Sequence, residues 1–239
     1  MIHPEILAVL TRARPGTFMA EAARRARQAC RHRQPGRASG TRTRPQLAAE
    51  GTPVVLRDGS AVLIRQVCST DAPLLADGFA RLSPRSRWMR FLGAKTTMSA
   101  AELRYFTEVD HHDHEAIGAL SAADGRGVGI ARYVRDAGDP QAAEIAVTVV
   151  DDWQGRGLGT ELLSRLSDRA RQAGIDRFTA LAAAENAAVA GLARKLGACL
   201  AGRGPGTVEY EVALAPAEYS LDWWLDCMDG LAQPVREGR

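Results

Sequence analysis

The residues best suited to chemistry lie in one stretch, where an apolar segment runs through a glycine-spaced loop into an amphipathic helix. Residues 144–150 alternate between the two faces expected of a strand and are rich in β-branched side chains, which predicts a strand. The loop that follows contains Gln154, Gly155, Arg156, Gly157, Leu158, Gly159 and Thr160. Its glycines remove the Cβ atoms that would keep a ligand off the backbone, and the first N–H groups of the helix lack intrahelical partners. This order predicts a pocket for an anion such as phosphate.

The glycine spacing separates the possible kinds of phosphate loop. A Walker A loop ends in Gly-Lys-Ser/Thr, and no lysine lies near this loop. A dinucleotide fingerprint reads GxGxxG, whereas Gly155, Gly157 and Gly159 read GxGxG. A second run at 125–129 has the same glycine spacing but leads into another predicted strand, which favours a simple hairpin turn there. The loop at 154–160 therefore fits neither of these two nucleotide motifs.

The loop does fit the pattern Q/R-x-x-G-x-G/A through Gln154, Gly157 and Gly159, and in this it resembles motif A of the GNAT acetyltransferases. Residues 55–198 as a whole are similar to the catalytic domain of bacterial protein-lysine acetyltransferases. The matching segments are LRDGSAVLIR, RLSPRSRWMRF, SAAELRYFTEVD, ARYVRD, AEIAVTVVDDWQGRGLG and AENAAVAGLARKLGA. The resemblance implies an acetyl-coenzyme A cosubstrate, with its pyrophosphate on the loop amides and a further bond from Asn186. By residue type alone, Asn186 is also a good helix N-cap.

Acetyl transfer to lysine needs a neutral amine, and because free lysine titrates near pH 10.4, a base or a water chain must accept its proton. Glu144 lies ten residues before Gln154, and the resemblance matches it to the glutamate that acts as the family's general base. A solvent-facing strand glutamate without a role is the alternative interpretation. Reserve candidates for the base lie in the loop before the strand at 115, and these are Asp110, His112 and Glu115.

Two further features of the chemistry follow from the resemblance. Strand N–H groups near Val147 and Val149 are expected to polarise the acyl carbonyl, with the main chain of Val149 meeting the pantetheine arm. Many family members carry a tyrosine as general acid seven residues after the conserved asparagine, and here that position is Ala193. A thiol titrates with a pKa near 8.5, so its thiolate is a fair leaving group. We expect the coenzyme thiolate to depart directly or to take a proton from water.

Turn and cap signals predict the elements that hold these residues. Asp58-Gly59 predicts a hairpin between strands at 54–57 and 61–67, and helices are predicted from Thr70, from Ser83-Pro84 and from the Ser99–Glu102 capping box. The remaining elements are strands at 115–120, 127–135 and 142–150, the helix after the loop, a strand at 177–184, a helix at 186–196, and strands at 198–202 and 207–214. This order predicts an α+β GNAT fold with a central mixed, mostly antiparallel sheet flanked by helices.

Composition divides the 239-residue chain into three parts. Residues 1–53 are a basic, low-complexity extension, residues 54–215 the acetyltransferase domain, and residues 216–239 a tail with a short amphipathic helix that carries two tryptophans. Residues 1–51 hold ten arginines against three glutamates, a charge of +7, so the remainder sums to 3 − 7 = −4. We expect this mildly acidic part to attract basic partners and not nucleic acid.

Several function classes are excluded on pattern. No run of eighteen apolar residues and no signal core is present, so no membrane association is expected. The four cysteines are scattered without metal spacing, which favours free thiols in a reducing cytoplasm. Neighbouring histidines at 111, 112 and 114 rarely reach one ion together, so no metal is expected. The arginines at 85, 87 and 90 are interpreted as solvated or structural.

The sequence thus predicts a cytoplasmic N-acetyltransferase that uses acetyl-coenzyme A and transfers the acetyl group to an exposed lysine of a protein substrate. Direct attack in a ternary complex is the expected mechanism. Two alternatives stay open: a small-molecule amine as acceptor, and a non-catalytic sensor that binds an acyl-coenzyme A. The sequence predicts neither the identity of the acceptor nor the oligomeric state.

Overall fold

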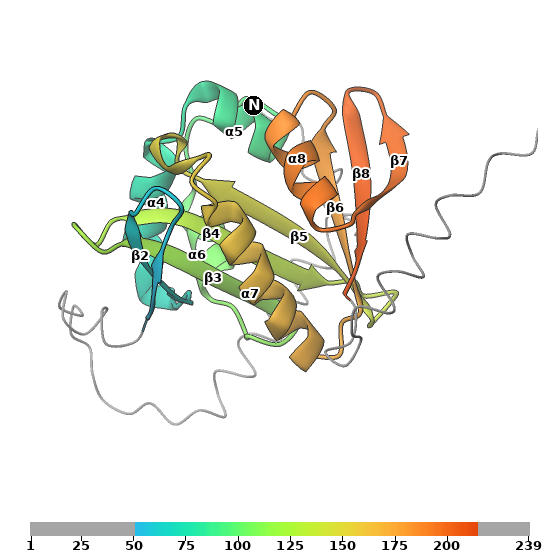
Figure 1. Cartoon of the computed structure of the whole chain (residues 1–239), viewed down its shortest axis with the longest axis horizontal. Coiled ribbons are helices and arrows are strands. Elements are labelled where there is room, and N and C mark those ends of the chain that lie inside the picture. Colours follow the sequence, from blue (N-terminus) through green and yellow to red (C-terminus); the bar gives the residue numbers. More distant parts are fainter. Residues whose placement is uncertain (1–50, 215–239) are drawn as a thin grey trace, which may run out of the picture.

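The computed structural model describes residues 51–214, which form one eight-stranded sheet with helices on both faces (Figure 1). The strands run in the order β1-β2-β3-β4-β5-β6-β8-β7. Their bounds are β1 Thr52–Val55, β2 Ala61–Gln66, β3 His114–Ser121, β4 Gly127–Arg135, β5 Ala142–Val149, β6 Arg177–Ala183, β7 Cys199–Gly204 and β8 Thr207–Ala213. The predicted α+β mixed sheet is confirmed. β1 begins two residues before the predicted domain boundary, and the tryptophan tail and nearly all of the basic extension lie outside the described residues.

Two helices of this region begin where the cap signals predict, after Ser83 and after Ser99, whereas Thr70 lies within a 3₁₀ turn and the helix predicted from it begins at Ala72. The helices of residues 51–214 are α4 Ala72–Ala80, α5 Pro84–Phe91, α6 Ala100–Thr107, α7 Leu158–Gln172 and α8 Ala187–Lys195, with short 3₁₀ turns at Ser69–Asp71 and Asp151–Trp153. The Ser83 hydroxyl accepts the N–H of Ser86 at 3.1 Å, and Ser99 and Glu102 form the expected reciprocal capping box. Each cap satisfies backbone groups that a helix end leaves unpaired, which fixes where the helix starts.

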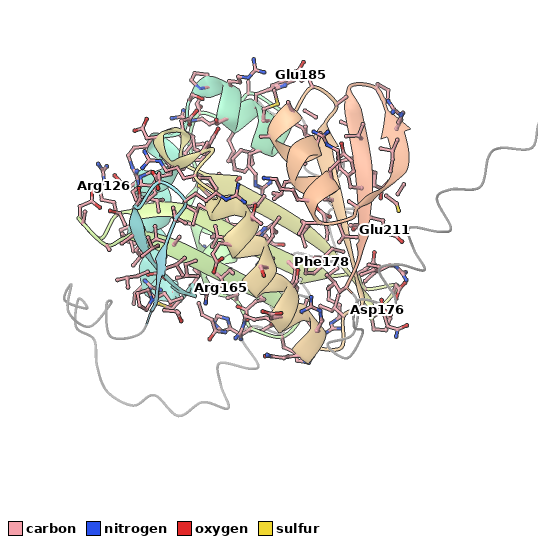
Figure 2. All side chains as sticks on the ribbon, viewed as in Figure 1. Arg126, Arg165, Asp176, Phe178, Glu185 and Glu211 are labelled. Carbon is pink, nitrogen blue, oxygen red and sulfur yellow. The ribbon has the colours of Figure 1, made fainter. Side chains whose placement is uncertain are left out.

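The two faces of the sheet carry different helices. α7 lies across β3, β4 and β5 on one face, while α4 packs with α6 and against β4 on the other (Figure 1). The α7 stripe is buried as the spacing predicted, and its members are Leu158, Leu162, Leu163, Leu166 and Ala170. Gly129 in β4 permits close packing, because a Cβ there would lie 3.1 Å from Leu158 and Leu162. Phe178 continues this core beneath α7 (Figure 2).

The sheet opens in the middle, between β5 and β6. These two strands form its one parallel pair, and they pair over only three residues, from Ala142–Arg177 to Glu144–Thr179. Beyond Glu144 they diverge (Figure 1), while β5 stays fully paired with β4 on its other edge. Residues 145–149 therefore present one backbone edge that no neighbouring strand covers.

Candidate active site

The glycine-spaced loop delivers its backbone amides to the start of α7. Gly157 is the N-cap residue with φ +94°, a conformation that favours glycine, and no side chain caps the helix. The first intrahelical bond runs from Glu161 N–H to the Gly157 carbonyl, at 3.1 Å. The amides of Leu158, Gly159 and Thr160 therefore have no intrahelical acceptor, and the helix dipole adds a partial positive charge there. This arrangement suits a phosphate group.

The β1–β2 hairpin braces this loop from outside. Arg156 pairs with Asp58 at 2.9 Å, donates to the Ser60 hydroxyl at 2.9 Å and stacks on the Trp153 ring at 4.9 Å. Its backbone carbonyl also accepts the N–H of Arg57 at 3.3 Å. The Arg156 side chain is thus committed to the hairpin, so its backbone, and not its guanidinium, is the part available to a ligand.

The open edge of β5 leads from the loop to Glu144. Val150 N–H bonds to Val128 in β4, so by strand alternation the backbone groups of Val147 and Val149 face the opposite, unpaired edge. The Val149 carbonyl accepts the amide of Gln154 at 3.0 Å. Gln154 therefore ties the loop to the strand end. The other peptide groups of this edge are positioned to bond an extended ligand arm.

Glu144 lies at the last paired position before β5 and β6 diverge, on the sheet face that α7 does not cover. Burial raises its pKa to about 7, while the charges of Arg132 and Arg90 oppose the shift. Within residues 51–214 its carboxylate has no hydrogen-bond or ion-pair partner. A carboxyl group with these properties is half-ionised near neutral pH and can accept a proton.

Of the reserve candidates for the base, Asp110 and His112 lie in the loop before β3 as predicted, whereas the loop position predicted for Glu115 is wrong. Glu115 lies inside β3 and not in a loop, and its side chain points to the α7 face, where it is 0 % exposed and bonds His111 at 2.7 Å, Gln66 at 3.1 Å and Arg169. Burial favours its neutral form, yet bonds from His111 and Arg169 outweigh this and hold the pKa of Glu115 below its usual value.

The two other reserve candidates hold the preceding loop in shape. Asp110 accepts the N–H groups of His112, Asp113 and His114, each at 2.9 Å. The His112 ring bonds Asp113 at 2.9 Å. These hydrogen bonds stabilise the turn that leads into β3.

At the start of α8, Asn186 caps the helix, and its side-chain oxygen accepts the N–H of Val189 at 3.1 Å. The predicted cap is confirmed, and the amide nitrogen stays available for a ligand. Ala193 is buried in the same helix, and Leu192 beside it approaches Gly159 of the loop. No proton donor can therefore come from position 193.

The sequence analysis missed the charged surroundings of Glu144. Arg90 was interpreted as solvated or structural, but its side chain lines the cavity beside β4 and β5, together with Arg132. Strand alternation could have indicated Arg132. The residues on either side of it, Ala131 and Tyr133, are buried on one face of the sheet, so the Arg132 side chain lies on the other face. The approach of Arg90 depends on how α5 packs, which no local pattern records.

Among residues 51–214, no cluster of three or more histidine, cysteine or acidic side chains could hold a metal ion. The helices of the same region include none that is both long and apolar enough to cross a membrane. Cys199 is exposed and forms no disulfide within residues 51–214. The polar groups gathered at the candidate site are Glu144, the two arginines and backbone amides.

The α+β sheet opens at one parallel pair, with a glycine loop suited to phosphate at one end of the opening and a half-buried carboxyl group at the other, an arrangement typical of a group-transfer enzyme with a phosphate-bearing cosubstrate. The family model of the acetyltransferase (GNAT) domain matches residues 61–198. This match covers more than half of the chain, and the chain belongs to the GNAT family.

Individual relatives agree with this assignment. The chain is 33% identical over 177 residues to Acetyltransferase Pat of Mycolicibacterium smegmatis, covering 73% of this chain and 53% of that protein, so it spans about half of that relative's length. It is 38% identical over 144 residues to Acetyltransferase PA5475 of Pseudomonas aeruginosa, covering 59% and 77%. The structure of the GNAT domain of S. lividans PAT superimposes with a TM-score of 0.65 at 29% identity, covering 68% of this chain and 96% of that domain.

Proposed function

We propose that this chain is an acetyl-coenzyme A-dependent N-acetyltransferase that acetylates a lysine side chain of a protein by direct attack in a ternary complex. The observation that carries the proposal is Glu144, a half-buried carboxyl group that has no bonded partner within residues 51–214 and lies where β5 and β6 diverge. Family membership and the loop amides support acetyl-coenzyme A as the donor.

The coenzyme would bind along a continuous path. Its pyrophosphate would lie on the amides of residues 157–160, next to the dipole of α7, with Asn186 as a further donor. Its extended arm would bond the open edge of β5 at Val147 and Val149. At about 3.3 Å per residue, Glu144 lies about 17 Å along the strand from Val149, which brings the thioester end of the arm toward the carboxylate.

The transfer then needs one base and one polarising donor. Glu144 first takes the proton of the lysine ammonium directly or through one water, and the neutral nitrogen then attacks the acetyl carbonyl and forms the N–C bond. The second proton, lost by the nitrogen after the attack, passes to water. A strand N–H near Val147 stabilises the developing oxyanion. When the C–S bond breaks, the thiolate leaves as such or takes a proton from water, because the buried Ala193 offers none.

A protein lysine as acceptor is supported by the resemblance of residues 55–198 to bacterial protein-lysine acetyltransferases. A cavity on the same sheet face, which begins at Ala146, two residues beyond Glu144 in β5, is lined mainly by apolar groups of α4, α5, α6 and the sheet. Such a lining fits the methylene arm of a lysine, while the amine at its end reaches Glu144.

Two measurements test the proposal. Isothermal titration should give saturable one-site binding of acetyl-coenzyme A to the full chain. A folded protein that does not bind it would refute the coenzyme assignment. Mass spectrometry of a lysate incubated with labelled acetyl-coenzyme A should then find new acetyl-lysine on proteins. If only small amines accept the label, the protein-lysine part of the proposal is wrong.

A further inference from the structure

The cavity that begins at Ala146 is unusual in its charge. It encloses about 880 Å³, including the space at its mouth, between α4, α5, α6 and the sheet. Four of its lining residues are charged, and two of these, Arg65 and Asp71, form a buried pair at 2.6 Å. The other two are Arg90 and Arg132, and neither has a carboxylate within ion-pair distance in the part of the chain that the structure describes.

Arg132 is held in place by stacking and not by hydrogen bonds. Its guanidinium lies 4.5 Å from the ring centre of Phe106 and 5.1 Å from that of Tyr105. Its Nη1 atom is buried and has no hydrogen-bond partner among the described residues. Burying a charged N–H donor without an acceptor costs free energy. The guanidinium of Arg132, held in one orientation at the cavity wall, therefore indicates a position for a ligand acceptor.

The surroundings favour an anion as that acceptor. Burial and the charge of Arg132 lower the pKa of Arg90, to about 10, so both guanidinium groups are charged at neutral pH. Glu144 is the one carboxylate that faces them, and its raised pKa leaves it only partly ionised. His114 lies on the same sheet face, because it is two residues before Ala116, which pairs with Arg132. Its buried Nε2 atom also has no hydrogen-bond partner within residues 51–214.

We propose that Arg132, assisted by Arg90, forms a subsite for a carboxylate that the acceptor carries near its amine. A planar guanidinium binds a carboxylate through two parallel hydrogen bonds, and the apolar walls strengthen that pairing. Arg132 is a diagonal cross-strand neighbour of Glu144, since Arg132 pairs with Ala146, so a carboxylate bound there lies one strand away from the amine. The inference rests on the proposed transferase function and names its acceptor class.

Two matched acceptor pairs test the subsite and separate its two sources of carboxylate. The first pair is an end-blocked lysine peptide with Glu or Gln beside the lysine. The second is free lysine against lysine amide, which differ only in the α-carboxylate. Thiol release with saturating acetyl-coenzyme A gives kcat/KM for each. Wild type should favour the carboxylate member of at least one pair by about tenfold or more, mainly through KM.

Arg132→Met keeps the apolar arm on the aromatic rings and should reduce that preference to within about twofold. Arg132→Lys should leave a partial preference, because an ammonium keeps the charge but not the bidentate geometry. Arg126→Met is the matched control, because this arginine lies at the periphery (Figure 2) and pairs with Asp77. It should leave the preference unchanged.

Two results would overturn the subsite while leaving the transferase function intact: equal kcat/KM within both pairs for wild type, or a preference that survives Arg132→Met. If no acceptor turns over, the same pairs are compared by isothermal titration on the coenzyme A-bound protein. A carboxylate preference lost in Arg132→Met then still supports the subsite, and no preference refutes it.

Discussion

Two glutamates on opposite faces of the same sheet, Glu115 fully buried and Glu144 half-buried, have opposite electrostatic surroundings. Glu115 lies under α7 and is bonded by His111, Gln66 and Arg169, which hold its pKa below the usual value despite its burial. Glu144 lies on the α4–α6 face with two arginines nearby but no bonded partner, and burial raises its pKa to about 7. One carboxylate is fully paired, and the other is not.

This difference separates a structural group from a chemical one. A carboxylate that accepts several hydrogen bonds is stabilised in its charged form and is a poor proton acceptor near neutral pH. A carboxyl that is buried without partners destabilises the fold when ionised, but its pKa suits general base catalysis. Glu115 is fully buried and Glu144 half-buried, yet the pKa is raised at Glu144 and lowered at Glu115, so the bonded partners and not the burial set the direction.

The largest expected effect is on turnover. Glu144→Gln should slow acetyl transfer by about 100- to 10,000-fold, because the amide cannot accept the lysine proton. The dissociation constant of acetyl-coenzyme A should stay within about threefold, since the loop and the β5 edge are unchanged. Stopped assays of acetyl transfer and isothermal titration measure the two quantities. Glu108→Gln, at an exposed glutamate after α6, is the control. A normal rate in Glu144→Gln would remove the distinction between the two glutamates.

Glu115→Gln should show the reverse pattern. It removes the charge that His111 and Arg169 contact, so we expect the free energy of unfolding to fall by about 2–3 kcal/mol. Denaturant unfolding measures this loss. The kcat of the protein that remains folded should stay within about threefold of wild type. A large loss of kcat with unchanged stability would instead return Glu115 to the list of candidate bases.

The pH dependence of stability should have opposite signs for the two residues. The folded-state pKa of Glu144 is raised, so its favourable contribution is complete below about pH 4.5 and is lost as the pH rises through about 7. Relative to wild type, Glu144→Gln should gain roughly 1–3 kcal/mol between pH 5 and pH 8, a range that allows for solvent screening of a half-buried group.

The folded-state pKa of Glu115 is lowered, so its contribution is present above its unfolded pKa and is lost as the pH falls. The deficit of Glu115→Gln should therefore shrink on acidification below about pH 4.5. Thermal unfolding of the three proteins from pH 3.5 to pH 8 measures both trends. Parallel curves for the two variants would contradict the assignment.

The smallest expected effect concerns the coenzyme end of the site. Gly157→Ala forces a side chain into a left-handed conformation at φ +94° and brings its Cβ to 3.4 Å from Arg57. We expect the affinity for acetyl-coenzyme A to fall about tenfold, which corresponds to about 1.4 kcal/mol. Gly174→Ala, at φ +77° after α7 with open space around it, has similar strain away from the loop. Equal losses of affinity in both variants would show a global effect.

Local signals in the sequence predicted much of this structure. The Ser99–Glu102 capping box and the Asp58-Gly59 turn fixed element boundaries because their bonds form between near neighbours in the chain. Strand periodicity placed Glu144 in a strand, and the family resemblance gave it the role of base. Glu115 stands at the edge of the predicted strand, where periodicity does not determine the sheet face, and β3 begins one residue earlier, at His114. Arg90 and the opening between β5 and β6 depend on tertiary packing, which no local spacing encodes.

The most direct test of Glu144 as the base is the pH profile of kcat/KM, which reports ionisations of the free protein, measured for wild type and Glu144→Gln with the same lysine peptide. The wild-type profile should rise with pH through an apparent pKa of about 7 as Glu144 loses its proton. That step should be absent in Glu144→Gln, whose residual rate follows only the ionisation of the amine. An identical step in both proteins would contradict the assignment of Glu144 as the group that accepts the proton.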